Sequence, residues 1–299
     1  MRGNPFVIAG PTAVGKTWIA AEVAERCGAE IIGADAFQVY AEMDVLTAKP
    51  SPEILAKVPH HMVGVIPLSE IFNAVQYAEM ARKAIAEVES RGKIPIVVGG
   101  TGFYIRALTG QLPEIPAANP DLRAQLERQS TDSLLLSLSH LDPVAAARID
   151  CRNPRRLVRA VEVCMLTGKP FSSFSLDPGT QRGVLIVRDR ADMHSRIEER
   201  TMRMFSQDVI GEISRIRALV GSTAAQAIGY REICAHLDGS MDREPCVRRI
   251  QQLTRQYAKR QLTWFRRQTN LTTIDLTTTP QCETLIASLV SRVLSSSAS

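Results

Sequence analysis

The stretch GPTAVGKT, residues 10–17, fits the pattern G-x-x-x-x-G-K-[ST], in which a glycine-rich loop ends in a lysine and a hydroxyl residue. Gly10 and Gly15 allow backbone conformations that other residues resist, so that consecutive N–H groups can face an anion. Lys16 adds a positive charge, and the Thr17 hydroxyl is a suitable ligand for Mg²⁺. The pattern predicts a polyphosphate site, but it does not distinguish a diphosphate from a triphosphate.

A P-loop nucleotide hydrolase normally has a second strand that ends in an acid near Mg²⁺. The apolar run KIPIVVGGTG ends in Gly99, Gly100 and Thr101 instead, and the available acid is Asp35, directly after EIIGA. Because ligands bind outside the carboxyl ends of parallel strands, we expect Gly10, Asp35 and Thr101 to converge in one crevice. Taken alone, Asp35 also fits a helix cap or loop charge, and Thr101 an ordinary turn residue.

Basic residues gather in PCVRRIQQLTRQYAKRQLTWFRRQ, residues 245–268, which contains seven of them and no acid. Helical spacing places Arg248, Arg255, Lys259 and Arg266 on one face, and Val247, Ile250, Leu253 and Tyr257 on an apolar stripe. A second cluster consists of Arg155, Arg156 and Arg159. Together with the net charge of +5, these faces suit a phosphate backbone, and the alternative for each is a solubilising surface.

The elements that must position these residues alternate in the first third of the chain. Strands are predicted in NPFVIAG, EIIGAD and KIPIVVGG, with helices at 17–27 and 73–91. Buried apolar runs that alternate with helices favour a parallel sheet covered on both faces. A further strand is predicted at 183–189, and a last short one in LTTIDL.

Three prolines in LPEIPAANP, residues 112–120, end this alternation, and only helical patterns follow them up to residue 180. Asp or Asn precedes several of these patterns, as N-caps do. We therefore predict an α/β fold: a P-loop NTPase-like parallel sheet flanked by helices. Residues 1–120 would form the first part of the core, 121–180 an all-helical insertion domain, and 181–299 the rest of the core with basic C-terminal helices.

Composition indicates the setting in which the chain works. Hydrophobic residues make up 45% of the chain and the mean hydropathy is −0.04, which is typical of a soluble globular protein. The first apolar run leads directly into the phosphate loop, unlike a signal peptide, and no run reaches the roughly 18 residues of a membrane span. The six cysteines lack C-x-x-C spacing, and His60–His61 lack further ligands at metal spacing. We expect a cytoplasmic, monomeric protein with reduced thiols and no membrane contact.

With these motifs in place, the sequence resembles the tRNA dimethylallyltransferase (tRNA isopentenyltransferase) family over nearly its whole length. The matching motifs, in order, are GPTAVGKT, DAFQVY, MDVLTAKP, PHHM, VVGGTGFYIRAL, DPVAAARI, NPRRLVRAVEV, AIGYRE and TRQYAKRQLTWFR. A generic P-loop kinase would share only the first motif, so the resemblance is specific.

The resemblance implies transfer of a dimethylallyl group from dimethylallyl diphosphate to the exocyclic amine of the adenosine 3′-adjacent to the tRNA anticodon. The leaving diphosphate would be held by Gly10, Pro11, Thr12, Ala13, Val14, Gly15, Lys16 and Thr17. Asp35 would be the general base, Thr101 would hydrogen-bond at the reacting centre, and Thr17 would ligate Mg²⁺. Lys16 and the metal would stabilise the leaving charge, and the adenine would be flipped out of its stack.

The resemblance also implies contacts with the anticodon stem-loop of tRNA. They would come from Asp35, Ala36, Phe37, Gln38, Thr101, Arg123, Arg155, Arg156, Leu157, Val158, Arg159, Gln226, Gly229, Tyr230, Arg231, Thr254, Arg255, Lys259, Arg260 and Gln261. The chain departs from the family at Ala36, where Ser is usual, at Leu46, where Gly is common, and at Gly64, where Asp is usual. None of these departures affects the phosphate loop, Asp35 or Thr101.

Three other functions each explain only part of the sequence. A P-loop kinase of small molecules would leave the basic helix and the missing strand-end acid unexplained. An enzyme that alkylates free adenine nucleotides would need no extended positive surface. A non-catalytic RNA-binding protein would leave Lys16 and Asp35 without a purpose.

Overall fold

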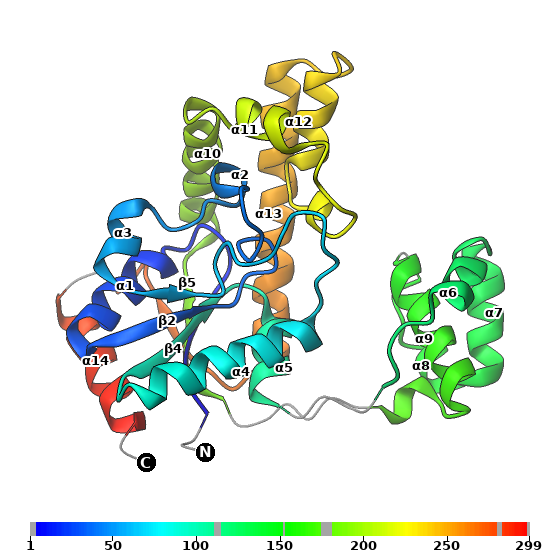
Figure 1. Ribbon diagram of the computed structural model, residues 1–299, viewed down its shortest axis with the longest axis horizontal. Coiled ribbons are helices and arrows are strands. Elements are labelled where there is room, and N and C mark those ends of the chain that lie inside the picture. The colour runs from blue at the N-terminus through cyan, green and yellow to red at the C-terminus, as the bar shows by residue number, and fades with distance from the viewer. Residues whose placement is uncertain (1–3, 111–114, 152, 175–180, 280–282, 298–299) are drawn as a thin grey trace. The chain divides into compact units, whose positions relative to one another are not determined.

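The computed structural model describes residues 4–110, 115–151, 153–174, 181–279 and 283–297, and it consists of two compact units (Figure 1). The first unit comprises Met1–Gly110 and Pro178–Ser299, and the second comprises Gln111–Asp177. The second unit thus interrupts the sequence of the first. Each unit has a hydrophobic cluster of its own.

The first unit is built on a six-stranded sheet in the order β3-β2-β4-β1-β5-β6, and every pair of neighbouring strands is parallel. The strands are β1 (Phe6–Ala9), β2 (Ala29–Gly33), β3 (His60–His61), β4 (Ile94–Gly99), β5 (Arg182–Val187) and β6 (Thr272–Asp275). The predicted P-loop-type α/β sheet is therefore confirmed. The sequence analysis did not anticipate β3, which places His60 and His61 on the edge beside β2.

Helices cover both faces of this sheet. Ile8, Ile96 and Ile186 pack into a cluster with α1 (Lys16–Cys27) and α14 (Glu283–Ser297). The neighbouring residues Val7 and Val97 are equally buried, although they point to the opposite face. On that side α4 (Ala74–Ser90) and α5 (Gly102–Thr109) lie together against the sheet (Figure 1). Burial on both faces explains why the strands read as continuous apolar runs.

The remaining helices of the first unit pack against one another beyond the sheet (Figure 1). They are α2 (Asp44–Thr47), α10 (Arg190–Ser206), α11 (Val209–Ile216), α12 (Tyr230–Leu237) and α13 (Arg243–Gln268), with a 3₁₀ turn at Ala224–Gln226. The exception is α3 (Pro52–Lys57), which packs on α1. α13 is the basic helix of the sequence analysis. It contacts α10, α12 and α5, and thereby reaches the sheet.

In the described residues, the second unit is entirely helical. It contains α6 (Pro120–Glu127), α7 (Thr131–Leu141), α8 (Pro143–Ala146), α9 (Pro154–Thr167) and a 3₁₀ turn at Phe171–Ser173. Side chains of Asn119, Ser130, Asp142 and Asn153 accept hydrogen bonds from the first turns of these four α-helices, which is how N-caps stabilise a helix start.

This unit begins before residue 121, where the insertion was expected to start. The Arg159 guanidinium donates to the Pro116 carbonyl (2.7 Å), and the Asn119 N–H donates to the Glu162 carboxylate (3.0 Å). The proline-rich segment, interpreted as a break, is therefore bonded into the helical unit. Within the described parts of the chain, no helix is both long and apolar enough to cross a membrane.

Candidate active site

The phosphate loop lies between β1 and α1, as its sequence pattern requires. Gly15 has a φ of 101°, and Ala13 also adopts a left-handed conformation with a φ of 64°. A Cβ atom on Gly10 would lie 2.5 Å from the Ile186 carbonyl oxygen, so only glycine fits this close approach to β5. These constraints shape a loop whose N–H groups surround the start of α1.

Lys16 is held inside this loop rather than extended into solvent. Its Nζ donates to the Pro11 carbonyl at 2.7 Å. Desolvation lowers the pKa of Lys16 to about 8, although the nearby Asp35 carboxylate acts in the opposite direction. The lysine is thus close enough to Asp35 for their charges to interact, which places the loop and the end of β2 at one site.

Three arginines that sequence reasoning missed support the loop from outside. Arg188 Nε donates to the Val14 carbonyl (3.0 Å), and Arg196 Nε donates to the Ala13 carbonyl (2.8 Å). Arg200 donates from Nη1 to Thr12 Oγ1 (2.8 Å) and from Nη2 to the Thr47 carbonyl (3.1 Å). Burial lowers the pKa of Arg200, against an opposing effect of Asp35. The i, i+4 spacing of Arg196 and Arg200 could have indicated a shared basic face on α10. The glutamates between them made this stretch look like an ordinary surface of mixed charge.

Asp35 and Thr101 tie the ends of β2 and β4 together. Asp35 Oδ1 accepts from the N–H groups of Phe37 (3.0 Å) and Gln38 (3.3 Å). Thr101 Oγ1 accepts from the Ala36 N–H (2.9 Å). In the described part of the chain no hydrogen bond engages Asp35 Oδ2, so one carboxylate oxygen orders the loop while the other can accept a proton.

Helix α13 closes the site with a stripe of polar side chains. Gln261 Oε1 accepts from the Thr12 N–H (2.9 Å), and its Nε2 donates to the Gly100 carbonyl (2.8 Å). Burial raises the pKa of Tyr257, which lies one turn earlier, although the nearby Thr101 and Gln261 side chains act in the opposite direction. A Cβ atom on Gly100 would lie 2.5 Å from Gln261 Nε2, which explains the glycine there. Gln261 therefore connects the phosphate loop to the turn after β4.

Two cavities share this site. The smaller, of about 50 Å³, has Thr12, Asp35 and Tyr257 in its wall together with the apolar side chains of Leu46, Met204 and Ile250. The larger, of about 770 Å³, runs along residues 15–18, α2, α3 and α10. Thr12, Asp35 and Arg200 line both cavities. A phosphorylated ligand in the loop would therefore extend toward the Asp35 carboxylate.

Apart from Asp35 and Thr101, the candidate tRNA-contacting residues of the first unit lie in three segments. Ala36, Phe37 and Gln38 follow β2, and Gln226, Gly229, Tyr230 and Arg231 surround the start of α12, while Thr254, Arg255, Lys259, Arg260 and Gln261 lie on α13. Thr254 shares the smaller cavity with Asp35, and Arg260 lies over the Tyr257 ring at 5.8 Å from its centroid. The Gln261 amide is bonded within the protein at both ends and the residue is only 6% exposed, so little of this side chain is accessible for a tRNA contact.

The basic face of α13 is less purely positive than its sequence suggested. Arg255 pairs with Glu198 of α10 (3.3 Å), and Arg248 pairs with Glu244, one turn earlier on its own helix. Glu198 comes from a distant segment of the sequence, and Glu244 directly precedes the acid-free stretch 245–268.

In the second unit the candidates separate into exposed and buried residues. Arg155 and Arg156 are exposed at the start of α9. Leu157 and Val158 are 0% and 4% exposed, so their side chains pack in the helical core, and the tRNA contact expected of this segment stays a prediction. The periodicity of α9 turns these two residues inward when the arginines face solvent.

Arg123 and Arg159 of the same unit both bind the fully buried carboxylate of Glu162, at 2.7 Å and 2.6 Å. Burial raises the pKa of Glu162, but the hydrogen bonds from the two arginines outweigh this effect and hold the pKa below its usual value. Arg123 therefore braces α6 against α9, while Arg159, on the same helix as Glu162, ties α9 to the segment before α6 through the Pro116 carbonyl.

A parallel sheet with a phosphate loop after β1 and a carboxylate after β2 defines a P-loop-type α/β protein whose site suits a phosphorylated group beside a carboxylate. The family model "IPP transferase" matches residues 38–268 of the sequence. The chain belongs to the IPP transferase family.

Relatives and solved structures agree with this assignment. The chain is 42% identical to the tRNA dimethylallyltransferases of Geobacter sulfurreducens and Thermus thermophilus, covering 87% of this chain and 88% of each relative. It resembles the tRNA isopentenylpyrophosphate transferase from Bacillus halodurans with a TM-score of 0.72 and 34% identity, over 100% and 97% of the two chains. It also resembles a eukaryotic dimethylallyltransferase solved while acting on tRNA, with a TM-score of 0.77 and 25% identity, over 93% of this chain and 75% of the other.

Proposed function

We propose that this protein transfers a dimethylallyl group from dimethylallyl diphosphate to the exocyclic amine of the adenosine 3′-adjacent to the anticodon in tRNA, releasing diphosphate. The observation that carries the proposal is that the phosphate loop and Asp35 line the same two cavities. Family membership supports it, because relatives that are 42% identical to this chain are tRNA dimethylallyltransferases.

On the donor side, charge develops on the leaving diphosphate as the allylic C–O bond breaks. Hydrogen bonds hold the Lys16 ammonium and the Arg200 guanidinium at the phosphate loop, where they and the loop N–H groups would stabilise this charge. Such prearranged donors are worth more in an enclosed site than in water, since they need no reorganisation during the reaction.

On the acceptor side, the adenine amine is a poor nucleophile because its lone pair is delocalised into the ring. As the new C–N bond forms, Asp35 Oδ2 would take the amine proton, while Oδ1 keeps its two backbone hydrogen bonds. Thr101, bonded to the Ala36 N–H, would hold the loop and hydrogen-bond at the reacting centre. The adenine must leave its stack to reach these groups. The free-energy cost of this step is small in an anticodon loop, because the base is not paired there.

Magnesium fits this site as a partner of the diphosphate rather than as an ion held by the protein alone. In the described residues, no three His, Cys, Asp or Glu side chains come together as a metal site. Mg²⁺ commonly uses one or two protein ligands plus phosphate oxygens, and Thr17 lines the larger cavity directly after Lys16. When bound there through Thr17, the ion would supply further positive charge to the leaving group.

The test is transfer of labelled dimethylallyl group from dimethylallyl diphosphate to bulk tRNA, in cytoplasm-like buffer, with Mg²⁺ or with a chelator. Label should appear in the anticodon stem-loop, and chelation should reduce its appearance. Parallel reactions with free adenine nucleotides as acceptors, and with ATP in place of the donor, test the two rival enzymes. Alkylated nucleotide or ADP production without labelled tRNA would refute the proposal. Light scattering of the same sample would check the expected monomer.

A further inference from the structure

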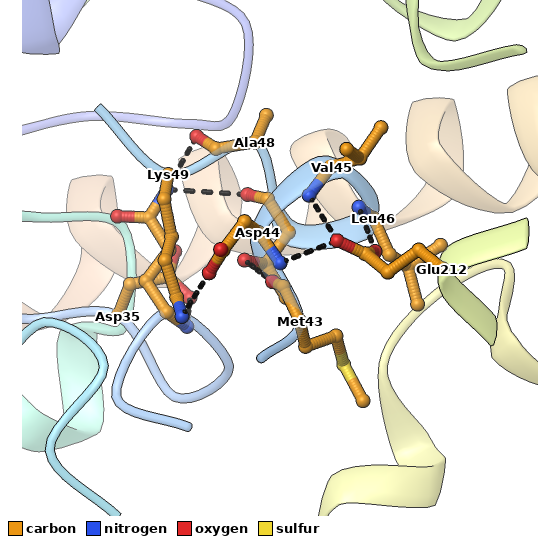
Figure 2. Close-up of polar contacts among 10 residues, drawn as sticks. Asp35, Met43, Asp44, Val45, Leu46, Ala48, Lys49 and Glu212 are labelled. Carbon is orange, nitrogen blue, oxygen red and sulfur yellow. Dashed lines mark hydrogen bonds and ion pairs between the residues drawn. The ribbon is translucent and has the colours of Figure 1, made fainter. Parts of the chain in front are cut away.

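Helix α2 is a four-residue helix that is bonded at both ends to side chains from distant parts of the first unit (Figure 2). At its start, Glu212 of α11 accepts three backbone hydrogen bonds. Oε1 accepts from Asp44 N–H and Val45 N–H, each at 2.7 Å, and Oε2 accepts from Leu46 N–H at 2.9 Å. Glu212 is only 6% exposed, so these bonds are shielded from water.

The other end of α2 receives two donors from the candidate active site. Gln38 Nε2 donates to the carbonyls of Thr47 (3.2 Å) and Ala48 (2.9 Å). Arg200 donates to the Thr47 carbonyl while its other nitrogen holds Thr12 of the phosphate loop. One short helix is thus bonded both to the acceptor-side loop and to the donor-side loop.

A helix this short has little stability of its own. Its first N–H groups have no partner within the helix, and a single turn fixes several residues for very few internal hydrogen bonds. The Met43 residue that precedes it provides no side-chain cap. Glu212 supplies what the local sequence lacks, namely a carboxylate that satisfies three N–H groups and suits the positive end of the helix.

The position of α2 then determines how Gln38 is presented. Because both hydrogen bonds to the carbonyls of Thr47 and Ala48 come from Nε2, the amide orientation is set, and no hydrogen bond within the described residues engages Oε1. The Gln38 N–H also donates to the Asp35 carboxylate. A displaced α2 would therefore disturb the residue next to the proposed base.

We propose that Glu212 is a positioning residue for the transfer reaction: it touches neither substrate, but it holds α2 so that Gln38 and Arg200 keep their places on the two sides of Asp35. The inference rests on the proposed function. It assigns to α11 a role that neither the phosphate-loop motif nor the basic helix suggests.

The first test replaces Glu212 by Gln, which keeps the size but puts an NH₂ group where an acceptor is needed. The single-turnover rate at saturating tRNA and donor should fall by about 10- to 100-fold, the range for a displacement of about 1 Å in an active site. The dissociation constant of the donor should change less than the rate, because the bonds of Lys16 and Arg196 to the phosphate loop are unaffected and only Arg200 loses part of its support.

A second pair of variants removes one donor and leaves Glu212 intact. Asp44→Pro deletes an N–H group at the first helical position, where proline is best tolerated. Asp44→Ala is its matched control, since both variants lose the Asp44–Lys49 ion pair. The transfer rate of Asp44→Pro should be at least about threefold lower than that of Asp44→Ala, because Asp44→Pro loses one of the three hydrogen bonds to Glu212. This comparison also applies if the Glu212→Gln chain does not fold.

A double variant tests whether Glu212 acts through Gln38. Glu212→Gln combined with Gln38→Ala should be slowed no more than about threefold beyond the slower single variant, since coupled residues are not additive. If the two losses multiply, Glu212 does not act through Gln38, and the inference is overturned.

Amide hydrogen exchange at residues 44–46 gives a readout that does not depend on activity. Protection should fall in Glu212→Gln and stay unchanged in Asp238→Asn, which removes the exposed ion pair between Asp238 and Arg217 just beyond α11. The Asp238→Asn chain should also transfer at the rate of the unsubstituted chain. Unchanged protection or an unchanged transfer rate in Glu212→Gln overturns the inference. An unsubstituted chain that transfers nothing to tRNA refutes the proposed function instead.

Discussion

The geometry of Asp35 suits both roles that the sequence offered as alternatives. Its Oδ1 orders the loop through two backbone N–H groups, as a loop-ordering residue would, and its Oδ2 has no hydrogen-bond partner among the described residues. A carboxylate held in this way keeps its orientation before substrate binds, which is what a general base requires.

Asp35→Asn should keep the loop bonds, because an amide oxygen can replace Oδ1, but it cannot take a proton. We expect the transfer rate to fall by about 10²- to 10⁴-fold, the usual value of general acid–base catalysis, while both substrates still bind. Single-turnover transfer at saturating substrate is the measurement. A rate within about threefold of the unsubstituted chain would leave Asp35 as a loop-ordering residue only.

Lys16 links donor binding to pH. Desolvation lowers its pKa to about 8, so the ammonium is present below that pH and is lost as the pH rises through it. Affinity for the diphosphate donor should therefore decline above about pH 8, by up to about tenfold per pH unit. Calorimetric titration of the donor between pH 7 and 9.5 measures this.

The Lys16→Ala chain is the matched control for that titration. It should bind donor weakly with a flat pH profile, transfer no dimethylallyl group, and bind tRNA nearly as well as the unsubstituted chain. A pH profile that persists in Lys16→Ala would assign the titration to another group.

At the scale of elements, α13 serves two purposes along one helix. One stripe reaches the sheet through Tyr257 and Gln261, and the opposite surface carries Lys259 and other basic residues into solvent. The same helix packs so closely on α5 that a Cβ atom on Gly102 would lie 2.1 Å from the Trp264 ring. Glycine at this position therefore follows from helix packing.

Gln261→Ala should weaken the connection between the phosphate loop and the turn after β4. It leaves the Thr12 N–H and the Gly100 carbonyl without their partner, which costs about 1–3 kcal/mol for buried polar groups. Urea unfolding should show this loss in the free energy of unfolding, and donor affinity should fall with it. Full stability with reduced tRNA affinity would instead make Gln261 an RNA contact.

The basic surface of α13 makes its own prediction. Arg255→Ala combined with Lys259→Ala should lower the slope of log affinity for tRNA against log salt by about 1–2 units, one for each lost phosphate contact. Because Arg255 is paired with Glu198, we expect Lys259→Ala alone to cause most of the change. Binding assays at several salt concentrations decide this, and an unchanged slope would make the surface merely solubilising.

On the scale of the whole molecule, the helical unit has its own polar centre. The carboxylate of Glu162 holds together α6, α9 and the segment before α6 through Arg123, Arg159 and the Asn119 N–H. Such a cluster leaves buried charge uncompensated when its central group is removed.

Glu162→Ala should lower the free energy of unfolding of the helical unit by about 2–3 kcal/mol. This is at or below the low end of the cost of breaking a buried ion pair, because both arginines are partly exposed to water. Hydrogen exchange resolved along the chain would locate the loss in residues 115–174. Donor affinity, which depends on the first unit, should stay unchanged. A uniform loss across both units would show instead that their stabilities are coupled.

The sequence by itself determined the class of this fold and the chemistry at its strand ends. Apolar runs that alternate with helices, the glycine pattern of residues 10–17 and the helical period of residues 245–268 are local signals, written in neighbouring residues. They were sufficient for the parallel sheet, the phosphate loop and the helical segment inserted into it.

Only the tertiary structure decided which polar side chains are engaged with one another. Glu212 lies 166–168 residues from its partners in α2, and Gln261 lies 249 residues from Thr12, so neither pairing leaves a periodic trace in the sequence. The same applies to Glu198 of α10, which pairs with Arg255 on the basic face of α13. Short-range periodicity specifies which face of a helix is apolar, but which distant group meets a polar side chain depends on how the helices pack.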